Sequence, residues 1–171
     1  MIDDLVEGLK KKNVQSISKL ISCIENNDSE NQKILDSIFP LINNSYRIGI
    51  TGPPGAGKST ITNLLIKKFR MNSLSVGVIL VDPSSPYSGG AILGDRIRMD
   101  QYYDDKDVFI RSIATRGSKG GLTANADEIA DILDAAGFDI IIFETVGVGQ
   151  IEIDVVEQVD TVILILVPES G

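Results

Sequence analysis

The sequence predicts an α/β fold in which helices flank a mainly parallel sheet, with a helical extension at the N-terminus. From Arg47 onward, short runs rich in β-branched residues alternate with segments of helical spacing, which is the pattern of βαβ units. These runs show little polar alternation, as expected of strands that are buried on both faces. The first run leads into a glycine-rich turn at 52–60, and the helix that follows completes a strand–loop–helix unit.

Residues 1–44 are predicted to form the N-terminal helical extension, and residues 45–171 the α/β domain. Apolar residues at helical spacing predict a helix over 5–24 with a break at Asn13. A second helix is expected over 30–39, where Pro40 ends it.

The α/β part is expected to contain strands and helices in regular alternation. The strands are expected at 47–51, 75–81, 107–113, 139–145 and 161–167, and the helices at 58–70, 92–103, 124–136 and 150–158. Ligands bind such sheets at the carboxyl ends of the strands. The polar motifs described next fall at those ends.

Composition excludes several classes of function. A net charge of −8 argues against nucleic acid as the main partner, and we interpret Lys10, Lys11 and Lys12 as a solvated helix face. With one cysteine and no histidine, a zinc site built on those ligands is excluded. The acidic start and the lack of an apolar stretch of about 20 residues predict a cytoplasmic protein without a targeting or membrane segment.

The turn at 52–60 reads Gly-Pro-Pro-Gly-Ala-Gly-Lys-Ser-Thr, which matches G-x-x-x-x-G-K-[ST]. Glycines let the backbone curl so that N–H groups converge on phosphate, and the helix N-terminus favours the anion. This motif predicts a P-loop NTPase fold that binds a nucleoside triphosphate. We expect Lys58 to contact only the ligand, at the β- and γ-phosphates, and Ser59 to bind Mg²⁺. The predicted phosphate-binding residues are Gly52, Pro53, Pro54, Gly55, Ala56, Gly57, Lys58, Ser59 and Thr60, and the helix behind them carries Ile61, Leu64, Leu65 and Phe69 on its apolar face.

Three acidic residues are candidates for the metal site. Asp82 ends the second predicted strand, and Asp95 lies in a glycine-flanked segment. Glu144 ends the fourth strand, with Gly147 three positions later; this layout is typical of a second phosphate-site motif. Because Glu is one methylene longer than Asp, we expect Glu144 to act on the metal through water.

A glycine-rich basic loop lies between these acids. It runs from Arg116 to Gly121 and holds Lys119, which is a candidate for contacting phosphate and at least equally consistent with a solvated loop charge. Arg116 is a candidate for stabilising the transition state of phosphoryl transfer.

The chain strongly resembles the MeaB/ArgK-type GTPases, the chaperones of methylmalonyl-CoA mutase and related B12 enzymes. The motifs that carry the resemblance are G-P-P-G-A-G-K-S-T (52–60), V-D-P-S-S-P (81–86), G-G-A-I-L-G-D-R-I-R-M (89–99), R-G-S-K-G-G (116–121) and E-T-V-G-V-G-Q (144–150). The resemblance implies binding of GTP, GDP and Mg²⁺, assistance in cobalamin loading and protection of a B12-dependent mutase, and a homodimer in the full-length protein. By the family pattern, Ser59, Asp82, Asp95 and Glu144 serve the metal, Lys58 binds phosphate and Gly147 senses the γ-phosphate. The predicted catalytic residues are Lys58, Arg116, Gly147 and Gln150.

The chain departs from this family in a few places. Ala91 and Ile97 replace the usual Ser and Thr, and Ile151 follows Gln150 in place of Ser. The sequence stops at Gly171 without an N-K-x-D guanine-reading motif, so we expect a truncated N-terminal portion. Such a portion is expected to bind nucleotides weakly, to hydrolyse them little, to distinguish GTP from ATP poorly and to self-associate.

Two other functions stay open. A small-molecule P-loop kinase would need an acceptor pocket and a lid with several arginines; Arg96, Arg98, Arg111 and Arg116 are available, but no lid insertion is evident. The chain could also be a nucleotide-binding remnant with little activity.

Overall fold

The computed structural model describes residues 2–26, 29–82, 102, 104–114, 125–145 and 157–167, with Asp82 and Ala114 described by their backbone alone. Within these ranges the strands form one five-stranded sheet in the order β3-β2-β4-β1-β5, and neighbouring strands pair in parallel. The strands are β1 Tyr46–Thr51, β2 Val76–Asp82, β3 Val108–Ala114, β4 Ile140–Thr145 and β5 Thr161–Leu164. The predicted parallel α/β fold is confirmed.

The last strand is shorter than its sequence predicts. It was expected over 161–167 and ends at Leu164. The Ile165 N–H still donates to the Thr51 carbonyl oxygen at 2.8 Å, but β1 itself ends at Thr51. Because the pairing with β1 ends at Thr51 and Leu164, residues 166 and 167 have no strand residues opposite them there.

The helices also follow the predicted order. They are α1 Ile2–Lys10, α2 Val14–Glu25, α3 Asn31–Ile38, α4 Lys58–Met71 and α6 Ala126–Ala135, with a 3₁₀ turn at Phe39–Leu41. The break expected at Asn13 is confirmed, because its side-chain oxygen caps α2 by accepting the Ser16 N–H at 2.9 Å. Most of the predicted helices 92–103 and 150–158 lies outside the described residues.

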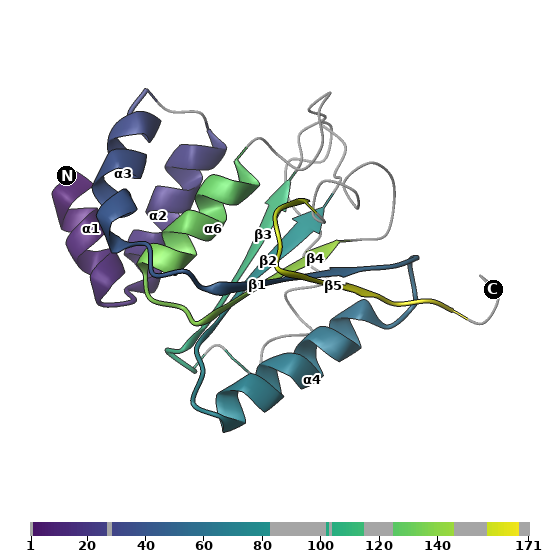
Figure 1. The fold of residues 1–171 in the computed structure, drawn as a ribbon. Coiled ribbons are helices and arrows are strands. Elements are labelled where there is room, and N and C mark those ends of the chain that lie inside the picture. The colour runs from purple at the N-terminus through teal and green to yellow at the C-terminus, as the bar shows by residue number, and fades with distance from the viewer. Residues whose placement is uncertain are drawn as a thin grey trace.

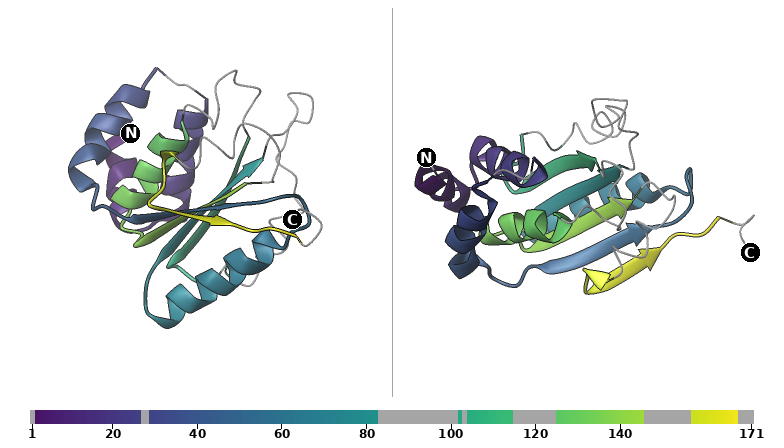
Figure 2. Two further views of the ribbon diagram at one scale, coloured as in Figure 1. Left: turned by 45° about the vertical axis from the view of Figure 1, so that its right-hand side comes forward. Right: turned by 90° about the horizontal axis from the view of Figure 1, so that it is seen from above.

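Helices cover both faces of the sheet (Figure 1). The N-terminal helices and α6 lie on one face and share a buried apolar cluster with the strands; α4 lies on the other face over a second cluster. Figure 2 shows the N-terminal helices near the start of β1, away from the loop between β1 and α4. In the described ranges, no helix is both long and apolar enough to cross a membrane.

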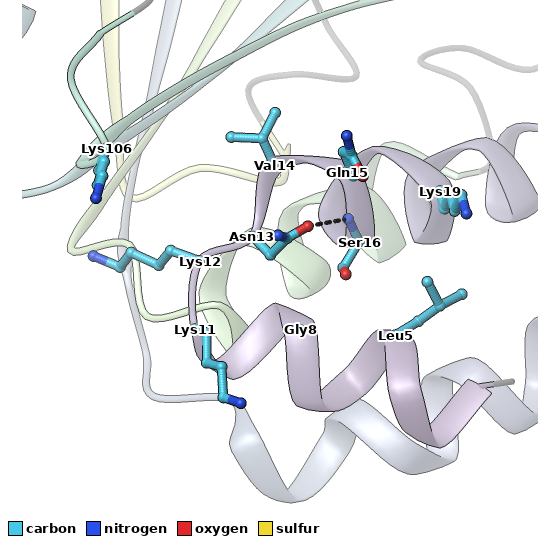
Figure 3. A pocket seen from close by; sticks show the side chains of 10 residues that line it. All are labelled: Leu5, Gly8, Lys11, Lys12, Asn13, Val14, Gln15, Ser16, Lys19 and Lys106. Carbon is cyan, nitrogen blue, oxygen red and sulfur yellow. Dashed lines mark hydrogen bonds between the residues drawn. The ribbon is translucent and has the colours of Figure 1, made fainter.

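The lysines near the end of α1 line a hollow of about 700 Å³ (Figure 3). Lys10 pairs with Glu7 at 2.7 Å, and Lys12 pairs with Asp107 at 3.3 Å while lying over the Phe138 ring. In Figure 3 the lysine side chains around the hollow point in different directions, so they do not converge on one anion. The expected solvated helix face is confirmed only in part, because α1 ends at Lys10 and Lys12 is partly buried in its contacts with Asp107 and Phe138.

An arginine of β3 ties the N-terminal helices to the sheet. The Arg111 Nη2 donates to Glu25 Oε2 at 2.5 Å and to Ser22 Oγ at 3.1 Å, and both acceptors lie on α2. The side chains of the ion pair are 21% and 18% exposed. Because the pair is largely shielded from water, its loss is expected to matter more than that of a surface pair.

Replacing Arg111 with alanine is therefore expected to lower the free energy of unfolding by about 1–3 kcal/mol. Chemical denaturation measures this change. The matched control is Lys10→Ala, which removes the exposed pair with Glu7 and should cost about 0.5 kcal/mol or less. Equal losses in the two variants would show that Arg111 does not anchor α2.

Candidate functional site

The loop between β1 and α4 has the backbone geometry of a phosphate cradle. Gly52, Gly55 and Gly57 have φ angles of 144°, 77° and 92°, which side-chain-bearing residues rarely adopt. Gly57 is the N-cap of α4, without a side-chain hydrogen bond, and the first turn holds no acidic residue. The first N–H of α4 to donate within the helix is that of Ile61, and its acceptor is the Gly57 carbonyl oxygen. The N–H groups of the first turn, which precede it, therefore point out of the N-terminal end of α4.

The start of this loop packs tightly against the chain that leaves β5. A Cβ built on Gly52 would lie 2.1 Å from the backbone oxygen of Ile165 and 3.1 Å from its carbonyl carbon. Both atoms belong to the backbone, so they cannot swing aside. Position 52 therefore requires glycine for close approach as well as for its φ angle.

Lys58 is the first residue of α4, and its ammonium group folds back over the loop. Its Nζ donates to the carbonyl oxygens of Gly52 at 2.7 Å and Pro53 at 2.9 Å, and the residue is 7% exposed. The expectation that Lys58 contacts only a ligand is thus wrong. The lysine also holds the loop in shape.

The buried face of α4 is the expected one only in part: Leu65 and Phe69 pack against the second apolar cluster. Lys58, Thr62 and Ile66 are buried at intervals of four residues, whereas Ile61 and Leu64, placed on the apolar face, are 37% and 59% exposed. The first turns of α4 therefore bury two polar residues, Lys58 and Thr62, next to the loop.

Glu144 meets this face of α4 from the sheet. It lies near the end of β4, opposite Ile50 of β1 and Leu80 of β2, and is 6% exposed. Its Oε1 accepts the Ser59 hydroxyl at 2.6 Å, and its Oε2 accepts the Thr62 hydroxyl at 2.5 Å. The fold thus brings Ser59 beside an acid 85 positions away in the sequence.

The remaining predicted site residues are only partly placed. Asp82 is the last residue of β2, with its side chain outside the described part. Asp95, Arg116, Gly147 and Gln150 also lie outside the described residues. Arg111, considered for a kinase acceptor site, is held by Glu25 and Ser22.

A family model described as methylmalonyl Co-A mutase-associated GTPase MeaB matches residues 17–171. The chain belongs to the MeaB family. Among its relatives, a Pyrococcus horikoshii protein called "Putative GTPase" is 54% identical over 99% of this chain and 54% of its own length. The GTPase ArgK of Escherichia coli is 37% identical over 97% of this chain and 51% of its own.

A solved structure shows the same fold. The crystal structure of a LAO/AO transport system kinase matches with a TM-score of 0.74 and 28% identity, over 96% of this chain and 49% of that one. The chain spans about half the length of the curated relatives it matches.

Thr62 is the contact that sequence reasoning missed in this MeaB-family chain. It is fully buried, and its hydroxyl lies on the carboxylate of Glu144. The available signal was a hydroxyl residue four positions after the P-loop lysine and four before Ile66, inside an amphipathic helix. Read alone, that spacing indicates only a small core residue.

The chemistry of these contacts suits a metal-bound polyphosphate. Outward N–H groups and the Lys58 ammonium attract phosphate oxygens. The Ser59 hydroxyl gives its single proton to Glu144, so the lone pairs of its oxygen remain available to a hard cation. The donor set therefore fits Mg²⁺.

Proposed function

We propose that this chain binds and hydrolyses GTP and that it assists cobalamin loading and protection of a B12-dependent acyl-CoA mutase. The observation that carries the nucleotide part is the contact of Ser59 with Glu144 beside the phosphate loop. A glycine-rich turn alone would bind an anion; a hydroxyl–carboxylate pair next to it adds the means to hold a metal with that anion.

The proposed roles rest on the sequence motifs and, for Lys58, Ser59 and Glu144, also on their contacts. Residues 52–60 surround the phosphates, and Ser59, Asp82, Asp95 and Glu144 form the metal set. Bound Mg²⁺ would offset the charge on the phosphate oxygens and help to orient them. Arg116, Gly147 and Gln150 complete the proposed catalytic group with Lys58.

Two of these side chains act through contacts that are already formed. Lys58 Nζ has three protons, so it can move at least one from a loop carbonyl to a phosphate oxygen without changing its rotamer greatly. Glu144 is held at both oxygens and can orient a water molecule while staying fixed itself.

The mutase part of the proposal rests on family membership. The matching family is described as mutase-associated, and a mouse relative, 35% identical over 99% of this chain, is named methylmalonic aciduria type A homolog, mitochondrial. We propose a methylmalonyl-CoA-type mutase as partner and a homodimer as the full-length assembly. Co-sedimentation with that mutase, with GDP or GTP present, tests the partnership; the absence of a complex with either nucleotide would contradict it.

Replacing Lys58 with alanine is expected to weaken triphosphate binding by about 10- to 100-fold, because a charge-assisted contact to a polyanion is lost. Isothermal titration with GTP and with ATP, each with Mg²⁺, measures the change and compares the two bases. Lys67→Ala removes an exposed lysine from the same helix and should leave both affinities unchanged. Wild-type affinity in the Lys58 variant would overturn the phosphate-loop assignment.

A further inference from the structure

Thr62 occupies an unusual place for a hydroxyl residue. It lies in the buried stripe of α4, one turn after Ser59, and none of its surface is exposed. Burial of a hydroxyl in an apolar stripe is unfavourable unless the group is hydrogen-bonded. Its neighbour on the sheet side is Glu144, so the threonine hydroxyl and the buried carboxylate each provide a hydrogen-bond partner for the other.

The hydroxyl of Thr62 has two acceptors within reach and one proton. The Lys58 carbonyl oxygen lies at 3.1 Å, and Glu144 Oε2 at 2.5 Å. The shorter contact to a carboxylate is the stronger one, because charge-assisted hydrogen bonds are shorter than neutral ones. The Lys58 carbonyl also faces the Thr62 N–H in regular helical geometry. The Thr62 hydroxyl therefore donates its hydrogen bond to Glu144 Oε2.

Ser59 and Thr62 lie within one helical turn, and their hydroxyls donate to the two different oxygens of the Glu144 carboxylate. Residues three apart lie on the same face of a helix, so the two hydroxyls approach Glu144 side by side. A carboxylate held at both oxygens cannot rotate about its last bond. Its plane is thereby fixed relative to α4, and α4 begins at the phosphate loop.

We propose that Thr62 is a positioning residue for the metal site. By holding Oε2 of Glu144, it keeps Oε1 against the hydroxyl of Ser59, so that the Ser59 oxygen presents its lone pairs to Mg²⁺ in one fixed direction. The site is then organised before the nucleotide arrives, and the coupling between Mg²⁺ and nucleotide affinity depends on the Thr62 hydroxyl. This inference rests on the proposed nucleotide binding.

The test compares Thr62→Val, which removes the hydroxyl and keeps the shape, with Thr62→Ser, which keeps the hydroxyl. The measurement is the factor by which Mg²⁺ tightens GTP affinity, from titrations with and without the metal. The control is Ser75→Ala. Ser75 is 3% exposed and donates its hydroxyl to the Asp139 carboxylate at 2.7 Å, at the opposite end of β2. Its backbone N–H, more than its hydroxyl, holds the pKa of Asp139 below the ordinary value.

The Mg²⁺ factor is expected to fall by about tenfold in Thr62→Val and to stay near wild type in Thr62→Ser. Ser75→Ala should lose stability while keeping the factor, because it removes a similar bond far from the site. An unchanged factor in Thr62→Val overturns the inference, and so does its loss in Thr62→Ser despite the retained hydroxyl. If wild-type protein binds no GTP with or without Mg²⁺, the proposed function itself fails, which is a separate result.

Discussion

Replacing Gly52 with alanine is expected to lower the free energy of unfolding by about 2–4 kcal/mol and to abolish nucleotide binding. The new methyl group would lie 2.1 Å from the Ile165 backbone oxygen, and the φ angle of 144° is strained for alanine. Relief requires moving either the loop or the chain leaving β5. Either movement displaces the Gly52 carbonyl oxygen, which accepts a hydrogen bond from the Lys58 ammonium group.

The matched control for this prediction is Gly55→Ala. Gly55 also has a positive φ, of 77°, but a Cβ there meets nothing within 4 Å. It should therefore show only the backbone strain, about 1 kcal/mol. Chemical denaturation compares the two variants, and titration with Mg²⁺–GTP reports the site. If Gly52→Ala is no less stable than Gly55→Ala, the close approach to Ile165 is not a constraint on the fold.

The sequence predicts the sheet well because parallel strands buried on both faces are marked by local composition. The runs that become β2 and β4 are almost wholly apolar, and burial confirms them. The phosphate loop is equally visible, since its glycines and lysine are adjacent in sequence. The break at Asn13 is also local, because the capping bond spans three residues.

Contacts between distant segments are what the sequence does not reveal. The approach of Gly52 to Ile165 depends on β5 pairing with β1, and the burial of Thr62 depends on the angle at which α4 meets the sheet. Helical spacing alone placed Ile61 and Leu64 inward, yet they are exposed. Apolar spacing identifies a helix, but it does not predict which polar residues of that helix are buried beside a functional site.

Replacing Glu144 with glutamine in the full-length protein is expected to reduce Mg²⁺-dependent GTP hydrolysis by about 100-fold or more while reducing nucleotide affinity far less. The carboxylate accepts protons from two hydroxyls, Ser59 and Thr62. A glutamine amide has one accepting oxygen, and its nitrogen only donates. One of the two hydroxyls must therefore turn and accept a hydrogen bond from the amide.

The consequence depends on which hydroxyl turns, and both cases impair the site. If Ser59 accepts from the amide, one of its lone pairs is engaged and the oxygen becomes a poorer metal ligand. If Thr62 turns, the negative charge beside the site is still lost. The phosphate cradle of N–H groups and Lys58 is unaffected in either case, which is why affinity should change less than hydrolysis.

Single-turnover phosphate release across a Mg²⁺ titration measures the first effect, and calorimetry with GTP measures the second. Asp139→Asn is the matched control: it also neutralises a carboxylate that accepts a serine hydroxyl, but at the amino end of β4. That variant should lose stability, because Asp139 accepts both the N–H and the hydroxyl of Ser75, and should hydrolyse GTP normally when folded. Hydrolysis by Glu144→Gln that matches wild type at every Mg²⁺ concentration would remove Glu144 from the metal site and leave it as a buried anchor for α4.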